Sequence, residues 1–202
     1  MSTNIINKLR ENKIFPIIRS SNTQDVIDKV NALIDGGLDV MEVNVETPNI
    51  FNAIRKVSDK AIICAGGIIT SMQAQVAIES GAKLFSSPIF QTNLLKISKD
   101  KQLPFLAGTS TANEAYTAWK SRIPVVKIYP ITAMGGVEYL KNLLRPMPFL
   151  SVIPQGDVKL SEIKDYLDAG ALAVGVGRNL INAGSYSEIT KRARTTLEQL
   201  NS

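Results

Sequence analysis

Short apolar runs alternate with longer segments of helical periodicity along the whole chain. The runs are rich in Ile, Val, Leu and Phe, as expected for strands that are covered on both faces. They lie at residues 14–19, 40–45, 61–65, 84–87, 104–107, 125–129, 150–154 and 173–176. Such alternation of strands with helices predicts a parallel α/β sheet.

Between the runs, apolar residues recur at the three- and four-residue spacing of an amphipathic helix. In residues 23–35, for example, Val26, Val30 and Leu33 fall on one face. Similar helices are expected at residues 71–80, 111–120, 136–144 and 160–169, with a further helix at 3–12 before the first run and a closing helix at 186–200.

The pattern predicts one (β/α)8 barrel, the TIM barrel, over residues 1–202, with an additional N-terminal helix. A weak internal repeat supports this, because Gly36, Gly81 and Gly170 each stand between a helix and the next run, where glycine accepts the left-handed turn that ends a helix. An open doubly wound sheet remains the alternative, since the pattern does not show whether the sheet closes. In a barrel, the active site lies at the carboxyl ends of the strands.

The amino-acid composition limits the possible reaction types mainly through the residues that the chain lacks or has only once. The chain has no histidine and one cysteine, Cys64. Ser-His and Cys-His nucleophiles, His-type zinc sites and an internal disulfide are therefore excluded. Acid–base chemistry is left to Asp, Glu, Lys, Tyr or water. The chain carries 23 Lys and Arg against 18 Asp and Glu, an excess that suits small anionic ligands but is too mild to indicate nucleic acid.

The sequence pattern does not predict a membrane-spanning helix or a signal peptide. No apolar stretch approaches the roughly 18 residues that a membrane-spanning helix needs, and residues 1–4 (MSTN) lack an apolar signal core. We therefore expect a cytoplasmic protein without a membrane partner.

Two charged residues interrupt apolar strands. Lys127 lies within residues 124–130 (PVVKIYP), and Glu42 lies within residues 40–45 (VMEVNV). A charge in a buried strand is costly unless it is paired or functional. One interpretation is a structural ion pair, or two side chains that reach solvent at the strand ends.

The other interpretation is a Schiff-base lysine. Desolvation disfavours an ammonium group and so favours a nucleophilic amine, which can attack a substrate ketone and form an iminium ion. The iminium is an electron sink for breaking the adjacent carbon–carbon bond. In a chain without histidine, Glu42 is the natural group to move the protons.

Further candidates lie at other strand ends. Arg19, after the first run, can hold a carboxylate or phosphate through two parallel hydrogen bonds, although a surface ion pair is the common role of such a residue. Gly175 and Gly177, before Arg178, form a turn whose backbone amides can hold a phosphate. Tight strand–helix packing explains this turn almost equally well.

Several segments, in order along nearly the whole chain, resemble motifs of the 2-keto-3-deoxy-6-phosphogluconate (KDPG) and 4-hydroxy-2-oxoglutarate aldolases. Residues 40–43 (VMEV) match the second-strand motif that carries the family's glutamate. Residues 126–130 (VKIYP) match its Lys-x-Phe-Pro motif, with Tyr129 in place of phenylalanine. Further matches are residues 65–66 (AG), 87–88 (SP), 108–114 (GTSTANE) and 174–177 (VGVG).

The resemblance implies a class I aldolase with a (β/α)8 barrel, in which Lys127 forms the Schiff base and Glu42 is the general acid/base. Its substrate would be a 2-keto-3-deoxy-6-phospho sugar acid, or a 2-oxo acid like 4-hydroxy-2-oxoglutarate, cleaved to pyruvate and an aldehyde. No metal or organic cofactor is implied, and a homo-oligomer, a trimer in many members, is expected. The expected substrate contacts are Arg19, Gly67, Pro88, Tyr129, Gln155, Gly156, Gly177 and Arg178.

The chain departs from the family pattern where the substrate is recognised. Many members have an arginine at the position of Glu46, and others have one at the end of the first strand, where this chain has Arg19. An acid beside a carboxylate substrate costs affinity unless it turns away or pairs with Arg19.

Four other positions depart as well. Gly67 replaces a threonine that contacts pyruvate, and the family's Pro-Thr-Gly-Gly segment becomes residues 154–157 (PQGD), which contain Gln155 and Asp157. Arg178 replaces a serine on the phosphate side.

Two other functions remain open. Glu46 and Gly67 motivate a non-catalytic family member that binds a sugar acid or phosphate. A different phosphosugar-binding barrel, such as an epimerase or isomerase, is the third hypothesis, and a lysine in the middle of a strand argues against it.

Overall fold

A ring of eight parallel strands forms the centre of the molecule. The computed structural model describes residues 2–47 and 49–201, and in it the strands follow the order β7-β6-β5-β4-β3-β2-β1-β8. Their bounds are β1 (Ile14–Ile18), β2 (Val40–Asn44), β3 (Ile62–Gly66), β4 (Leu84–Ser87), β5 (Phe105–Thr109), β6 (Val125–Ile128), β7 (Val152–Pro154) and β8 (Val174–Val176). A parallel bridge between Gln155 and Gly175 joins the last two strands. The predicted (β/α)8 barrel is confirmed, and the open sheet is excluded.

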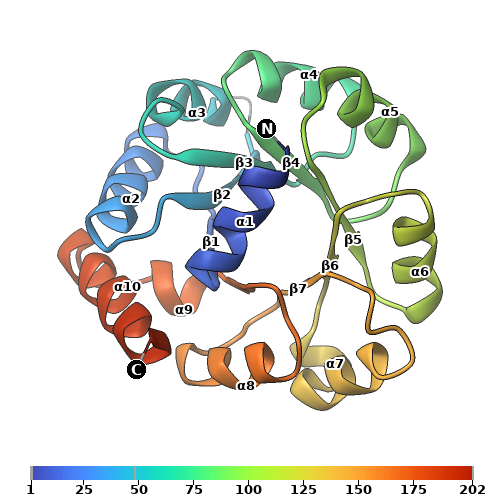
Figure 1. The fold of residues 1–202 in the computed structure, drawn as a ribbon. Coiled ribbons are helices and arrows are strands. Elements are labelled where there is room, and N and C mark those ends of the chain that lie inside the picture. Colours follow the sequence, from blue (N-terminus) through green and yellow to red (C-terminus); the bar gives the residue numbers. More distant parts are fainter. Residues whose placement is uncertain (1, 48, 202) are drawn as a thin grey trace.

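The helices surround this ring, and the first one crosses its end (Figure 1). Their bounds are α1 (Ser2–Asn12), α2 (Thr23–Asp35), α3 (Ile50–Val57), α4 (Ser71–Glu79), α5 (Thr92–Lys101), α6 (Ala112–Lys120), α7 (Gly136–Leu144), α8 (Ile163–Asp168), α9 (Arg178–Ile181) and α10 (Tyr186–Asn201). Short 3-10 helices precede α7 and α8 at Thr132–Met134 and Leu160–Glu162. None of the helices described is long and apolar enough to cross a membrane.

Some element boundaries differ from the sequence prediction. The strand predicted from residue 150 begins at Val152, because the amide of Leu150 is bonded in a turn to the carbonyl of Met147. The helix predicted over residues 160–169 begins as a 3-10 turn. Helix α2 begins after Asn22, whose side chain caps it by accepting hydrogen bonds from the amides of Gln24 and Asp25.

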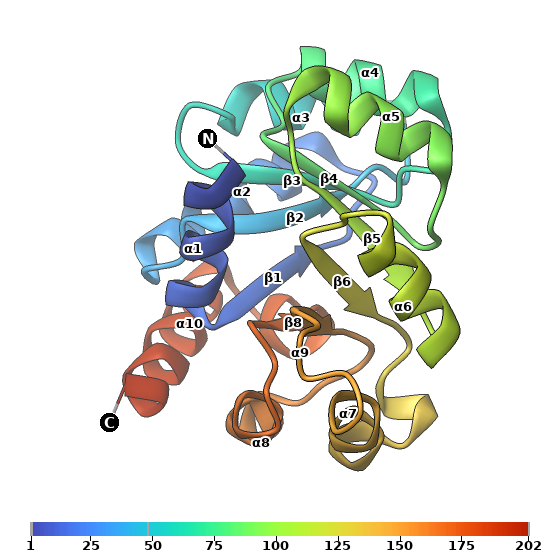
Figure 2. The same cartoon turned by 45° about the vertical axis from the view of Figure 1, so that its right-hand side comes forward.

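Two apolar cores lie on the two sides of the strands. The larger core fills the space between the strands and the outer helices. The smaller core lies inside the ring, where Ile5 and Leu9 of α1 pack with Phe15, Val40 and their neighbours. Figure 2 shows α1 at the amino ends of the strands. The additional helix therefore closes the bottom of the barrel.

The interior changes from apolar to polar along the strands. Because side chains alternate across a strand, Val40 and Glu42 face the interior from β2, as Val125 and Lys127 do from β6. Val40 and Val125 belong to the inner core, whereas Glu42 and Lys127 lie one step further toward the carboxyl ends and contact each other. The apolar lower layers thus support a polar upper layer at the catalytic face of the barrel.

The N-terminal helix provides the first test. Leu9 is fully buried, so Leu9→Ala is expected to lower the free energy of unfolding by about 2–4 kcal/mol. Arg10→Ala changes a neighbouring exposed position of the same helix and should alter it by less than about 0.5 kcal/mol. Urea unfolding followed by circular dichroism measures both. Equal stabilities of the two variants would show that α1 does not close the barrel.

Candidate active site

Lys127 and Glu42 meet inside the barrel. They come from β6 and β2, which lie opposite one another in the ring, and the Lys127 Nζ donates hydrogen bonds to Glu42 Oε2 at 2.7 Å and Oε1 at 2.9 Å. Lys127 is 5% exposed and Glu42 is 1% exposed. The two charges that looked out of place in the sequence are therefore one buried ion pair.

Hydrogen bonds on its other sides hold the Glu42 carboxylate. Ser86 Oγ donates to Glu42 Oε2 at 2.6 Å, and the Cys64 thiol donates to the same oxygen at 3.6 Å. Lys127 Nζ also donates to Ser86 Oγ at 3.3 Å. Below the ammonium group, the Phe15 ring centroid lies 6.0 Å from Nζ, at the outer limit of a cation–π contact. The pair is thus fixed before any substrate arrives.

Burial also sets the state of Cys64. Desolvation, helped by the negative charge of Glu42, raises the pKa of the Cys64 thiol well above its ordinary value. The thiol therefore keeps its proton at neutral pH and acts as a hydrogen-bond donor to the carboxylate. Such full burial is common for a free cysteine.

A second chain of contacts links Glu42 to the barrel mouth. Asn44 lies two residues after Glu42, and the donors and acceptors around it assign the orientation of its side-chain amide. In that orientation its nitrogen donates to Glu42 Oε1 at 3.0 Å, and its oxygen accepts from Arg19 Nη1 at 2.9 Å and Nη2 at 3.1 Å. Arg19 in turn pairs with Glu46, with Nη1 and Oε1 separated by 3.3 Å. An acid at position 46 would repel a carboxylate substrate unless it turned away or paired with Arg19, and the structure shows the pair.

Two adjoining cavities lie above the pair. The inner one has a volume of about 260 Å³ and is lined by Glu42 and Lys127 together with Asn44, Gly67, Ser86, Pro88 and others. The outer one has a volume of about 710 Å³ and extends to Gly156, Asp157, Gly177 and Arg178. Arg19, Tyr129 and Gln155 line both. Together they form a site with an inner compartment at the amine and a wider outer compartment.

Glycines keep the inner compartment open. A Cβ at Gly66 would collide with Asn44 and Glu42, so only glycine lets that strand pass the ion pair. Gly67 has φ +74, which favours glycine, and no other atom lies within 4 Å of where its Cβ would be. The position where the family has threonine is thus open space in the inner cavity.

The outer compartment is bounded by a second ion pair. Arg178 Nε donates to Asp157 Oδ1 at 2.7 Å. Arg178 opens the short helix α9, and Asp157 lies in the loop after β7, with φ +57. The arginine and the acid that replace the family's serine and glycine therefore face each other across the rim.

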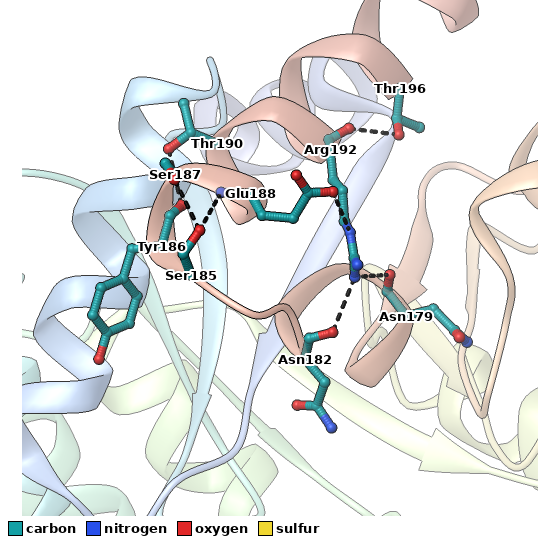
Figure 3. A network of polar contacts seen from close by, with 9 residues as sticks. All are labelled: Asn179, Asn182, Ser185, Tyr186, Ser187, Glu188, Thr190, Arg192 and Thr196. Carbon is teal, nitrogen blue, oxygen red and sulfur yellow. Dashed lines mark hydrogen bonds and ion pairs between the residues drawn. The ribbon is translucent and has the colours of Figure 1, made fainter.

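A network centred on Arg192 fixes the other end of α9 (Figure 3). From α10, Arg192 Nη1 donates to the carbonyls of Asn182 at 3.0 Å and Asn179 at 3.3 Å, while its Nε pairs with Glu188 at 3.3 Å. The Asn179 amide donates to the carbonyl of Val158 at 2.9 Å. These contacts tie α9 to both α10 and the loop after β7.

The substrate-binding residues predicted from the sequence all line this site. Gly67 and Pro88 line the inner cavity, and Gly156, Gly177 and Arg178 line the outer one. The sequence analysis missed Asn44 and Ser86. A signal was present for both, because each lies two residues beyond another inward-facing strand residue and so shares its face.

The fold and the site together define a class of protein. A buried primary amine lies beside a carboxylate at the carboxyl ends of the strands of a (β/α)8 barrel. This arrangement is typical of an enzyme whose lysine amine attacks a carbonyl carbon. Residues 5–194 match the family model "KDPG and KHG aldolase". The chain belongs to this family of aldolases, which are carbon–carbon lyases.

Similar proteins support the assignment. The chain is 31% identical to the 2-dehydro-3-deoxy-phosphogluconate aldolase of Haemophilus influenzae, over 96% of this chain and 95% of that protein. It is 29% identical to the KHG/KDPG aldolase of Escherichia coli, over 92% and 91%. The crystal structure of the 2-keto-3-deoxy-6-phospho-gluconate aldolase of Zymomonas mobilis superposes with a TM-score of 0.87 at 25% identity, covering 95% of each chain.

The buried ion pair between Lys127 and Glu42 leads to a prediction about the free energy of unfolding. Lys127→Met leaves the Glu42 carboxylate buried and unpaired, so it should lower the free energy of unfolding by about 3 kcal/mol or more. Adding Glu42→Gln removes that charge and should recover a large part of the loss, so that the double variant is more stable than Lys127→Met alone. Urea unfolding at neutral pH measures the set. Losses that simply add would contradict a coupled pair.

Proposed function

We propose that Lys127 forms an imine with a 2-oxo acid and that Glu42 transfers the protons, in an aldolase that releases pyruvate and an aldehyde. The observation that carries this is the buried contact of 2.7 Å between Lys127 Nζ and Glu42 Oε2 beneath an open cavity. A structural ion pair alone would not require the open space at Gly67, where no atom lies within 4 Å of the position of a Cβ.

Imine formation uses both members of the pair. Glu42 takes a proton from the ammonium group, which cancels both buried charges and leaves a neutral amine. The Lys127 nitrogen then adds to C2 of the 2-oxo acid and gives a carbinolamine. Glu42 returns its proton to the carbinolamine hydroxyl, water leaves, and the iminium ion forms.

The positive charge on the iminium nitrogen drives cleavage of the carbon–carbon bond. Glu42, again a carboxylate, takes the proton of the C4 hydroxyl. The C3–C4 bond breaks, its electron pair moves through C3 to the iminium nitrogen, and the aldehyde leaves from an enamine. Protonation of the enamine at C3 and addition of water to the resulting iminium release pyruvate and free Lys127.

The remaining groups position the substrate. Arg19 lines both compartments and can hold the carboxylate of the 2-oxo acid through its guanidinium group. Pro88 and Tyr129 border the inner cavity and would limit the position of the reacting carbons. Ser86 and Asn44 are positioning residues, because their hydrogen bonds hold the Glu42 carboxylate in place.

Trapping with borohydride tests the imine. Pyruvate plus borohydride should add covalently to Lys127, and Lys127→Met should abolish both the adduct and pyruvate release. Glu42→Gln should slow turnover by about 10²–10³-fold, because the proton carrier is lost. Lys141→Met, which changes an exposed lysine paired with Glu138, is the control. Mass spectrometry of the intact protein and of its peptides locates the adduct.

The outcomes of the trapping experiment distinguish the aldolase from the two alternative functions. Melting shifts with 2-oxo acids but without adduct or turnover would indicate a binding protein instead. Full activity of a Lys127 variant on a phosphosugar would indicate an epimerase or isomerase.

We further propose a cytoplasmic homotrimer. Three large apolar side chains are exposed in the loops after β3 and β4 and at the start of α4, namely Ile69, Met72 and Ile89, with Met72 74% exposed. Apolar groups left on one side of a barrel are typical of surfaces that associate.

Light scattering during size exclusion tests the trimer. The measured mass should be three times the 22.0 kDa of the chain. Met72→Glu should shift the population toward smaller species, because it places a charge in the proposed interface, whereas Tyr116→Glu, at an exposed apolar side chain of α6, should not. A monomeric wild-type protein would overturn this proposal.

A further inference from the structure

We propose that Arg192 is a positioning residue for the outer compartment. It fixes α9 and, through Asn179, the loop after β7, so that both segments hold the end of the substrate that leaves as the aldehyde. This inference rests on the proposed function. Arg192 belongs to α10 and is not among the described residues that line either compartment, so it acts on the substrate only through the residues that it holds.

The outer compartment lies where the far end of a bound 2-oxo acid extends. The reacting carbonyl carbon meets Lys127 in the inner compartment, and the two compartments adjoin and share lining residues. The lining of the outer compartment includes residues 155–157, after β7, and Gly177 with part of α9, after β8. The positions of these two segments therefore decide how well the tail of the substrate fits.

Helix α9 depends on its neighbours. It has four residues, and a helix this short is not stable by itself. Leu180 and Ile181 are buried in the larger core, but the C-terminal end of α9 also borders open space. Ile181 and Asn182 line the outer compartment and, toward α2 and α10, a further cavity of about 610 Å³. Packing at this end of α9 is therefore incomplete, and polar contacts supply the rest of the support.

Arg192 makes those polar contacts (Figure 3). The last carbonyls of a helix have no partner within it, and Arg192 Nη1 donates to two of them, to Asn182 at 3.0 Å and to Asn179 at 3.3 Å. Its Nε pairs at 3.3 Å with Glu188, four residues earlier on α10. Because the planar guanidinium group presents its donors in a fixed geometry, one side chain anchors the C-terminal end of α9 to α10.

Asn179 extends this support to the loop after β7. Its carbonyl accepts from Arg192, and its side-chain amide donates to the carbonyl of Val158 at 2.9 Å and to Asp157 Oδ1 at 3.5 Å. Asp157 also pairs with Arg178, at the other end of α9. A chain of hydrogen bonds therefore runs from α10 through Asn179 to the loop after β7, so a displacement of α9 moves both segments that line the outer compartment.

Arg192→Met tests the positioning. Methionine keeps an unbranched side chain but donates no hydrogen bond, so KM for 2-keto-3-deoxy-6-phosphogluconate, which carries a long tail beyond its reacting carbons, should rise about five- to tenfold. Because Lys127 and Glu42 are untouched, kcat should change by less than about twofold, as expected when only binding is lost. Assays of pyruvate release measure both constants. An unchanged KM, or a loss confined to kcat, would overturn the inference.

Arg194→Met is the matched control. Arg194 lies two residues further along the same helix, and its Nη2 donates to the carbonyl of Asp35, at the end of α2, at 2.9 Å. The control therefore removes the same charge and a bond of the same kind, but it releases α2 instead of α9. It should leave KM unchanged. A rise in KM equal to that of Arg192→Met would show a general effect of α10 and would overturn the specific role of Arg192.

Hydrogen exchange gives a readout that needs no substrate. The amides of Leu180, Ile181 and Asn182 donate to carbonyls at the start of α9. In Arg192→Met they should exchange about tenfold faster, because local opening of α9 becomes easier, while the amides of the strands keep their wild-type rates. Equal acceleration along the whole chain would indicate a loss of global stability and would contradict the inference.

Borohydride trapping with pyruvate separates this inference from the proposed function. Pyruvate has no tail and occupies only the inner compartment, so Arg192→Met should need the same pyruvate concentration as the wild type for half-maximal trapping. If the wild-type protein formed no adduct, the proposed function itself would be refuted. If it formed the adduct but did not cleave 2-keto-3-deoxy-6-phosphogluconate, or if the trapping concentration of Arg192→Met rose as much as its KM, only the role of Arg192 would be refuted.

Discussion

The contact between Lys127 and Glu42 is the constraint on which the rest of the structure depends. Two opposite charges face each other across the barrel at 2.7 Å, in an interior where an unpaired charge would be very costly. Ser86 and Asn44 satisfy further sites on the carboxylate. Glycine at Gly66 leaves room for both. The interior is therefore arranged around a pair that can exchange a proton without creating net charge.

The barrel also explains why this pair stands where a substrate can reach it. Apolar side chains fill the lower interior, and α1 covers the amino ends of the strands. Polar residues then occupy the layers toward the carboxyl ends, beneath two open cavities. One end of the barrel is thus sealed for stability, and the other remains accessible for chemistry.

Chemistry and recognition are carried by separate parts of the site. The amine and the carboxylate lie deep on β6 and β2, as the resemblance to aldolases implies, whereas three of the departures from the family pattern, Glu46, Asp157 and Arg178, form ion pairs at the rim. There, Glu46 and Asp157 each hold an arginine. A family member can change its substrate in this way without disturbing the two residues proposed to make and break bonds.

The sequence by itself determined the alternation of strands with helices and the two charges within apolar strands, because these follow from periodicity and from the cost of burying a charge. It also indicated most of the strand ends that line the site, although it did not indicate Asn44 or Ser86. Only the tertiary structure decided which charged side chains pair with one another. Glu42 and Lys127 lie 85 residues apart, and Arg178 and Asp157 come from different strand–helix loops. Which side chains meet depends on how the ring closes and on how each side chain turns, and neither is encoded in local spacing.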